Sequence, residues 1–168
     1  DVIPPVLEEH AALARLAVRA ASERRPDVVS LIEAASARHV GHLLDEATLT
    51  LGAGKGSRSW ALDALPGVDE VAWDSLRTIP IAAVTGSNGK TTTVRLVAAC
   101  ARAHGWCDGF NCTDGVFIGR KAVASGDYSG PAGTRLVLRD TSVEAAVLET
   151  ARGGILRRGL AADRADVA

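Results

Sequence analysis

The segment of this sequence best suited to chemistry reads Gly86-Ser87-Asn88-Gly89-Lys90-Thr91-Thr92-Thr93 and follows an apolar run at residues 79–84. Glycines let a backbone turn tightly and approach a ligand closely, and the free amides at the start of a helix attract phosphate. Lys90 would place a positive charge at the β- and γ-phosphates of ATP, and the Thr91 hydroxyl would bind Mg²⁺. The pattern predicts a phosphate-binding loop (P-loop) in which residues 86–92 contact the nucleotide.

The general P-loop pattern has a further glycine at the position of Val84, so the match to that pattern alone is incomplete. The alternative is a glycine- and asparagine-rich turn between a strand and a helix that carries a surface lysine. A second glycine-rich stretch, residues 51–57, also contains a lysine but lacks the Gly-Lys-Thr or Gly-Lys-Ser ending. We expect a flexible turn there, with a secondary anion contact as the alternative.

The elements expected around the loop alternate between strands and helices. Short apolar runs predict strands, helical spacing predicts helices, and the order is strand 79–84, helix 91–102, strand 116–118, helix 134–138, strand 145–148 and a turn or helix from Ala151. This order indicates an α/β fold with a parallel sheet covered by helices. In such sheets ligands bind at the carboxyl ends of the strands.

Four further positions are candidates for the site at that sheet edge. Glu149 closes the strand 145–148, so its carboxylate would hold Mg²⁺ near the loop; the alternative is an acid that caps the next turn. Thr113 and Asp114 lie in a glycine-flanked loop suited to substrate contact. Arg152, beside two glycines, would reach a phosphoryl group or a substrate carboxylate, unless it is a plain surface arginine.

Asp127 is a fifth candidate for substrate contact, and its alternative role is to brace the loop 126–130.

The N-terminal part differs from the rest of the chain in its sequence pattern. Residues 6–24 read as an amphipathic helix, and a second helix begins at Pro26 and carries an apolar side that extends to Leu44. We predict a helical segment and linker over residues 1–78, followed by an ATP-binding domain over residues 79–168.

Three stretches of the sequence resemble one known protein family and so narrow the function expected of the P-loop segment. Residues 85–93 resemble the ATP-binding loop of the Mur ligase family, and residues 112–131 and 147–160 resemble the Mur-like domain of its cyanophycin synthetase branch. The resemblance covers about residues 79–168 and implies the α/β central domain of that family. It implies an ATP- and Mg²⁺-dependent ligase that joins a carboxylate to an amine through an acyl phosphate, with an amino acid or peptide as substrate.

Within that resemblance Lys90 and Glu149 are the candidate catalytic residues, and Thr91 and Glu149 are the candidate metal ligands. Two rival functions stay open: a P-loop phosphotransferase or ATPase, and a nucleotide-binding module without catalysis. The chain begins at Asp1, contains no methionine and stops in the apolar run 165–168. We therefore expect a ligase fragment, truncated at its C-terminal end, that does not ligate alone. Its richness in alanine and arginine indicates a bacterial source.

Composition narrows the partners. Lys plus Arg (19) nearly balances Asp plus Glu (20), so no charge excess favours nucleic acid or a membrane surface. No apolar run is long enough to span a bilayer, and the N-terminus does not read as a signal peptide. Three cysteines without a Cys-x-x-Cys pair favour a reduced, cytoplasmic setting. The sequence leaves both a monomer and a homo-oligomer open.

Overall fold

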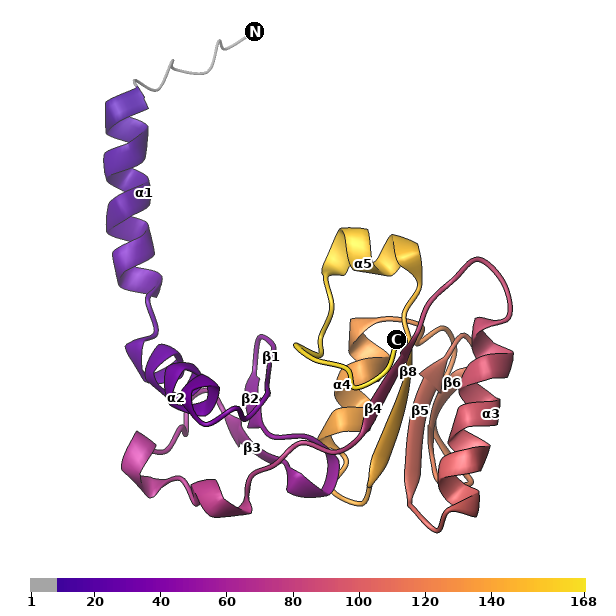
Figure 1. Ribbon diagram of the computed structural model, residues 1–168. Helices are drawn as coiled ribbons and strands as arrows, with labels where there is room; N and C mark the ends of the chain where they lie inside the picture. Colours follow the sequence, from indigo (N-terminus) through magenta and orange to yellow (C-terminus); the bar gives the residue numbers. More distant parts are fainter. Residues whose placement is uncertain (1–8) are drawn as a thin grey trace, which may run out of the picture.

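A five-stranded sheet forms the centre of the larger part of the molecule (Figure 1). The computed structural model describes residues 9–168, apart from the side chains of Ser22, Gly154 and Arg158. The helices are α1 Glu9–Glu23, α2 Pro26–Ala37, α3 Lys90–Ala103, α4 Pro131–Arg139 and α5 Arg152–Arg158. The strands are β1 His42–Leu44, β2 Thr48–Leu51, β3 Arg58–Ala61, β4 Ile81–Val84, β5 Asp108–Cys112, β6 Gly115–Ile118, β7 Lys121–Ser125 and β8 Ala145–Glu149.

The five-stranded sheet is mixed, which corrects the expectation of a purely parallel one. Its order is β4-β8-β5-β6-β7; β4, β8 and β5 run parallel, whereas β6 and β7 are antiparallel to their neighbours. The reason is the short connections. Only Thr113 and Asp114 separate β5 from β6, and a loop of two residues can join only antiparallel strands. The α/β class is confirmed, with parallel strands at the end of the sheet that carries the 85–89 loop.

The two faces of the sheet are covered by different helices (Figure 1). Side chains alternate across a strand, so Phe110 and Cys112 of β5 pack with Val94 and Ala98 of α3. On the opposite face Leu148 packs in a separate apolar cluster together with the α4 residues that the same cluster contains, Val137 and Leu138. Helices α3 and α4 therefore each bury one apolar stripe against the sheet.

Residues 9–78 are not simply a helical segment and a linker. After α1 and α2, the chain builds a second, antiparallel sheet in the order β1-β2-β3. The predicted second helix ends at Ala37 rather than continuing to Leu44, because His39 adopts a left-handed conformation (φ 56°) that a right-handed helix cannot contain. Residues 6–8 of the first predicted helix lie outside the described residues, and the domain boundary at residue 78 stays a prediction.

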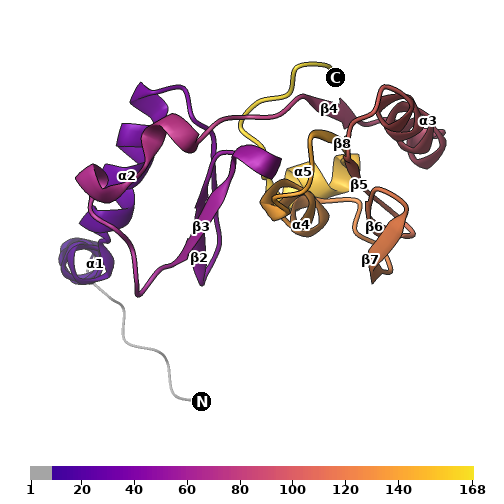
Figure 2. The same ribbon diagram turned by 90° about the horizontal axis from the view of Figure 1, so that it is seen from below.

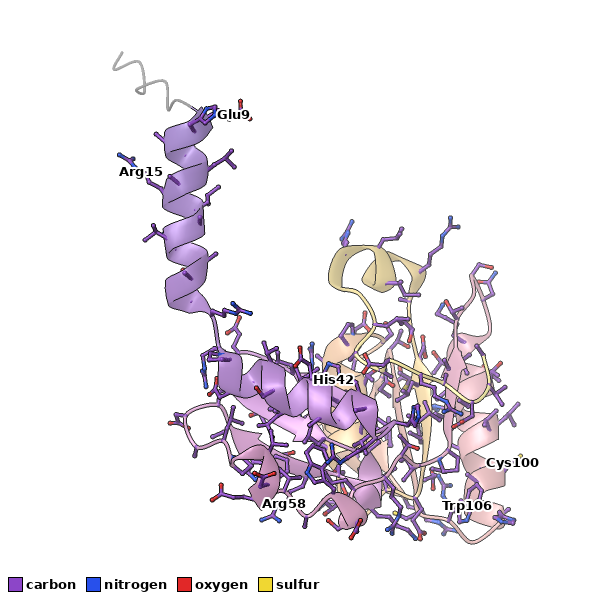
Figure 3. The ribbon with its side chains drawn as sticks, turned by 60° about the vertical axis from the view of Figure 1, so that its left-hand side comes forward. Glu9, Arg15, His42, Arg58, Cys100 and Trp106 are labelled. Atoms are coloured by element: carbon purple, nitrogen blue, oxygen red, sulfur yellow. The ribbon has the colours of Figure 1, made fainter. Side chains whose placement is uncertain are left out.

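Helix α1 extends away from the rest of the molecule (Figures 1 and 3). Figure 3 shows the side chains of Glu9 and Arg15 well apart from both sheets. Among the described residues, no helix is both long enough and apolar enough to cross a bilayer. The candidate site residues belong to the five-stranded sheet and to the loops and helices that follow its strands.

The smaller sheet is attached to the larger one through α4 and the loop that follows it (Figure 2). Arg139 of α4 donates to Asp45 Oδ2 (2.5 Å) and to Thr50 Oγ1 (2.9 Å). Lys55 forms an ion pair with Glu144, and its backbone amide donates to the Val143 carbonyl oxygen (2.8 Å). These contacts connect the N-terminal unit to the loop between α4 and β8.

Candidate functional site

Three neighbouring parallel strands end at the same edge of the sheet, and each delivers predicted site residues there. Strand β4 leads into the β4–α3 loop (residues 85–89), β5 leads to Thr113 and Asp114, and β8 ends at Glu149. The register places Val84 opposite Glu149, so the start of the loop and this acid are adjacent. The parallel arrangement of β4, β8 and β5 thus brings the loop, Thr113 and Glu149 to one place.

The β4–α3 loop has the backbone conformation that its glycines favour. Gly86 has φ 140° and Gly89 has φ 77°, both in the region that residues with a Cβ rarely adopt. Gly89 is the N-cap of α3, and the first helical hydrogen bond runs from the Thr93 amide to its carbonyl (2.9 Å). The amides of residues 90–92 therefore have no acceptor within the helix, and they are available to an anion.

Lys90 is the first residue of α3, and its ammonium is held only weakly. Its Nζ lies 3.5 Å from the Ser87 carbonyl oxygen, at the outer limit of a hydrogen bond. The loop residues 85–89 are exposed to solvent. A methyl group added at Gly89 would meet no described atom within 4 Å. The loop is thus open on its outer side, with a cationic side chain and free amides next to the opening.

Glu149 is the acid at the centre of the site. Its side chain is completely buried, and its Oε2 accepts a hydrogen bond from Thr91 Oγ1 (2.8 Å), which in turn lies 3.2 Å from Thr113 Oγ1. Glu149 Oε1 is also buried and has no hydrogen-bond partner among the described residues. Leaving a carboxylate oxygen buried without a donor or a cation is costly.

The unpaired oxygen tests whether the site fits a divalent cation. Mg²⁺ takes oxygen ligands and is held by one or two carboxylates together with substrate phosphates. The Glu149 carboxylate and the Thr91 hydroxyl supply such oxygens next to the β4–α3 loop. The residues present therefore fit Mg²⁺, and its coordination by Thr91 and Glu149 stays a prediction. Residues 9–168 contain no cluster of three His, Cys, Asp or Glu side chains that would hold a metal alone.

The remaining predicted residues are spread over a wider area. Asp114 lies beside Thr113 but forms an ion pair with Arg95 of α3 (2.6 Å). Asp127 accepts hydrogen bonds from the amide (3.0 Å) and hydroxyl (2.6 Å) of Ser129, the arrangement expected if it braces its loop. Arg152 is exposed at the start of α5. The structure brings Thr113 to Thr91 and Glu149, and it does not bring Asp127 or Arg152 into contact with them.

A polar cavity is lined by Asp127, one of the predicted residues, and by Ala151, which follows closely after Glu149. It has a volume of about 250 Å³ and is lined by residues 127–133 together with Ala151, Gly153 and Arg157. Asp127 therefore faces a cavity that the start of α4 and the start of α5 border. Substrate contact by Asp127 and Arg152 remains a prediction.

Sequence reasoning missed Asn111, a completely buried polar residue of β5 whose amide nitrogen donates to the Glu149 carbonyl oxygen (2.9 Å). It also missed Arg95, which holds Asp114. Strand β5 was not predicted, because Asp, Gly and Asn are depleted in strands and form most of it. The available signal was a polar residue between Phe110 and Cys112, two residues of types that are often buried.

Known proteins resemble the part of the chain that carries this site. The family model described as the Mur ligase middle domain matches residues 84–168, just over half of the chain. The chain belongs to the Mur ligase family. The match begins at the last residue of β4 and therefore includes the β4–α3 loop, Thr113 and Glu149.

Several curated relatives of this Mur ligase chain are cyanophycin synthetases. Those of Crocosphaera subtropica and Synechocystis sp. are 55% and 56% identical to it over 89 residues, and that of Geminocystis herdmanii is 55% identical over the same length. In each case the match covers 53% of this chain and 10% of the relative. The matched segment thus spans about a tenth of the length of these proteins, and their names describe their own activity.

Proposed function

We propose that this chain is the ATP-binding part of a ligase that joins a carboxylate to an amine, with an amino acid or a peptide as substrate. The observation that carries the proposal is the buried Glu149 carboxylate hydrogen-bonded to Thr91 at the start of α3, directly beside the open β4–α3 loop. Membership of the Mur ligase family and the similarity to cyanophycin synthetases support it. A phosphotransferase would use the same loop, and membership of the Mur ligase family favours the ligase over it.

In the proposed reaction an oxygen of the substrate carboxylate attacks the γ-phosphorus of ATP, the bond to the β-phosphate oxygen breaks, and ADP leaves. The amine then attacks the acyl carbon, phosphate leaves, and the amine proton passes to solvent. The chain's share is placement and charge neutralisation. Lys90 and the amides of residues 90–92 hold the phosphates, and Thr91 and Glu149 hold Mg²⁺, which neutralises phosphate charge when bound.

Thr113 and Asp114 extend from the end of β5 beside this group, and we assign them to the substrate side of the site. Asp127 and Arg152 would contact the substrate from the loops next to the polar cavity. The whole ligase reaction is expected to require more protein than this chain, since the match covers only 10% of each relative. We expect the chain alone to bind nucleotide without ligating, and we expect the enzyme to act in the cytoplasm.

The test is phosphate release from ATP by the complete parent protein with Mg²⁺, measured across a panel of amino acids and short acidic peptides. We expect release that needs both a carboxylate and an amine and that disappears in the Lys90→Ala variant. Release that needs only an alcohol acceptor, or no acceptor, would contradict the ligase and identify a phosphotransferase or an ATPase. Nucleotide binding without turnover under any condition would identify a binding module.

A further inference from the structure

Asn111 is a polar residue enclosed between the sheet and α4. Residues of β5 alternate between the two faces, so Asn111 lies on the α4 face, opposite to Phe110 and Cys112. It is completely buried. A methyl group at Gly133 of α4 would lie 2.8 Å from Asn111 Cβ and would overlap the Tyr128 carbonyl oxygen. The absence of a side chain at Gly133 therefore leaves the space that Asn111 occupies.

The amide nitrogen of Asn111 connects two segments that border the site. Its Nδ2 donates to the carbonyl oxygen of Glu149 (2.9 Å) and to that of Tyr128 (2.6 Å). Because both partners are backbone acceptors, the amide must present its NH₂ group to them, which uses both of its protons. One buried side chain thus joins the end of β8 to the loop that carries Asp127.

The hydrogen bond from Asn111 to Glu149 takes the place of a backbone hydrogen bond between β5 and β8 at Glu149, the proposed Mg²⁺ ligand. The parallel pairing of β5 with β8 matches Asn111 with Leu148, and no pair of the register includes Glu149 on that side. On its other side Glu149 pairs with Val84, whose carbonyl oxygen accepts from the Thr150 amide (2.9 Å). The Asn111 side chain therefore fixes the Glu149 backbone from the β5 side.

The placement of Glu149 matters because its carboxylate is confined. Its Oε2 is held by Thr91 and its Oε1 is buried without a described partner, so a small shift of the backbone would move the unpaired oxygen relative to Thr91. Groups behind a metal ligand that orient it commonly change metal affinity by about 10- to 100-fold when removed. Asn111 stands in that position behind Glu149.

We propose that Asn111 is a positioning residue of the Mg²⁺–nucleotide site: its amide sets the position of Glu149 and, through Tyr128, of the loop 126–130. The proposal rests on the proposed function, since it requires that the Thr91–Glu149 pair binds Mg²⁺ with ATP. Asn111 contacts neither the nucleotide nor the metal in this account and acts only through Glu149 and Tyr128.

The test compares two substitutions of similar size in the full chain. Both Asn111→Leu and Asn111→Asp lack the NH₂ group that donates to the two carbonyl oxygens. We would measure ATP dissociation constants by titration calorimetry with Mg²⁺ and with EDTA at pH 8. Val143→Ala, a buried change between α4 and β8 outside the site, is the control for general loss of stability.

We expect both Asn111 variants to weaken Mg²⁺-dependent ATP binding by about tenfold at pH 8 while leaving binding in EDTA within twofold. The Asp variant loses the same donor with a side chain of nearly the same volume, because a carboxylate cannot donate to the two carbonyl oxygens. Val143→Ala should lower the melting temperature without changing the Mg²⁺ dependence. If the Leu variant does not fold by circular dichroism, the Asp variant decides.

Two results would overturn the inference in distinguishable ways. If wild type binds Mg²⁺–ATP and the folded Asn111 variants bind it equally well, Asn111 does not position the site, and the proposed function stands. If wild type itself shows no Mg²⁺-dependent ATP binding, the proposed function fails, and the role of Asn111 fails with it.

Discussion

Two glycine-rich segments with a lysine occur in this chain, and the structure uses them in opposite ways. In the β4–α3 loop, residues 85–89 are exposed, and Lys90 makes only one weak contact with its own loop. In the Gly54 turn (residues 52–56), Gly52, Gly54 and Gly56 are buried, and Lys55 pairs with Glu144. Nearly the same residue types form an open loop in one place and a packed contact in the other.

The difference lies in what surrounds the backbone rather than in glycine content. A methyl group at Gly54 would overlap the Val143 carbonyl oxygen and would lie 2.5 Å from Ile79 Cδ1, so glycine is required there for close packing. A methyl group at Gly89 would meet nothing described. Glycine in a loop thus indicates a ligand only where the loop is open and a helix begins beside it.

The largest effect that separates the two segments should be on folding. Gly54→Ala combines a backbone overlap with an unfavourable φ of 55°, and we expect it to cost about 3 kcal/mol or more of unfolding free energy. Gly89→Ala carries only the cost of its φ of 77°, about 1–2 kcal/mol. Urea unfolding of both variants checks the ranking, and a reversed order would show that the Gly54 turn is not packed as described.

The next effect should be on metal-dependent binding. Replacing the buried carboxylate with an amide in Glu149→Gln removes the charged ligand, and we expect Mg²⁺–ATP affinity to fall by about 10- to 100-fold. Glu144→Gln, the matched change at the Lys55 pair, should leave that affinity unchanged. Calorimetry over a range of Mg²⁺ concentrations distinguishes them, and equal losses in the two variants would remove Glu149 from the site.

Sequence patterns predicted the segment of β4, its loop and α3 well because local rules govern it. A short apolar strand, a glycine turn and an amphipathic helix are all encoded within residues 79–102, and the structure has β4 and α3 there. Strand β5 was not predictable in the same way. Its Asp108 is buried because Arg102 donates two hydrogen bonds to it (2.8 and 2.7 Å), and its Gly109 leaves room for Val143.

The N-terminal sheet and the partners of the site residues were also not predicted, because contacts between residues distant in sequence determine them. Leu43 and Leu44 continue a helical pattern, but their strand is set by pairing with β2, a contact that spacing in the sequence does not reveal. The pairing of Asp114 with Arg95, like that of Asn111 with Glu149, depends on which strands become neighbours. Long-range packing, rather than propensity, decided these positions.

A smaller effect concerns the attachment of the N-terminal unit. Arg139 connects α4 to Asp45 and Thr50, and Arg139→Ala should lower the unfolding free energy by about 1–3 kcal/mol because it removes the donor from the partly buried Asp45 Oδ2 atom. Nucleotide binding should change little, since Arg139 lies at the far end of α4 from the site. Urea unfolding alongside calorimetry checks both parts; a strong loss of ATP affinity would contradict the purely structural role.

The smallest effect is on pH dependence. Burial raises the pKa of Asp45, but hydrogen bonds from the Ala47 and Thr48 amides and from Arg139 outweigh it and hold that pKa below its ordinary value. The hydrogen bond from Lys55 likewise lowers the pKa of Glu144. A lowered pKa in the folded state gives stability that is present above the unfolded pKa and is lost as pH falls through the folded one.

The loss should therefore occur below about pH 4. Asp45→Asn should flatten the decrease of melting temperature between about pH 5 and pH 2, since the group no longer titrates. The measurement is a series of thermal melts of wild type and variant across that range. An unchanged slope would show that the Asp45–Arg139 pair does not contribute to the acid sensitivity.

We infer that the β4–α3 loop binds nucleotide and that the Gly54 turn does not. Calorimetric titration of Mg²⁺–ATP into wild type, Lys90→Ala and Lys55→Ala tests this difference. We expect Lys90→Ala to weaken binding by about 100-fold, through loss of the charge at the phosphates, and Lys55→Ala to leave it within twofold. Equal binding by wild type and Lys90→Ala, or a larger loss in Lys55→Ala, would show that the β4–α3 loop is not the nucleotide-binding loop.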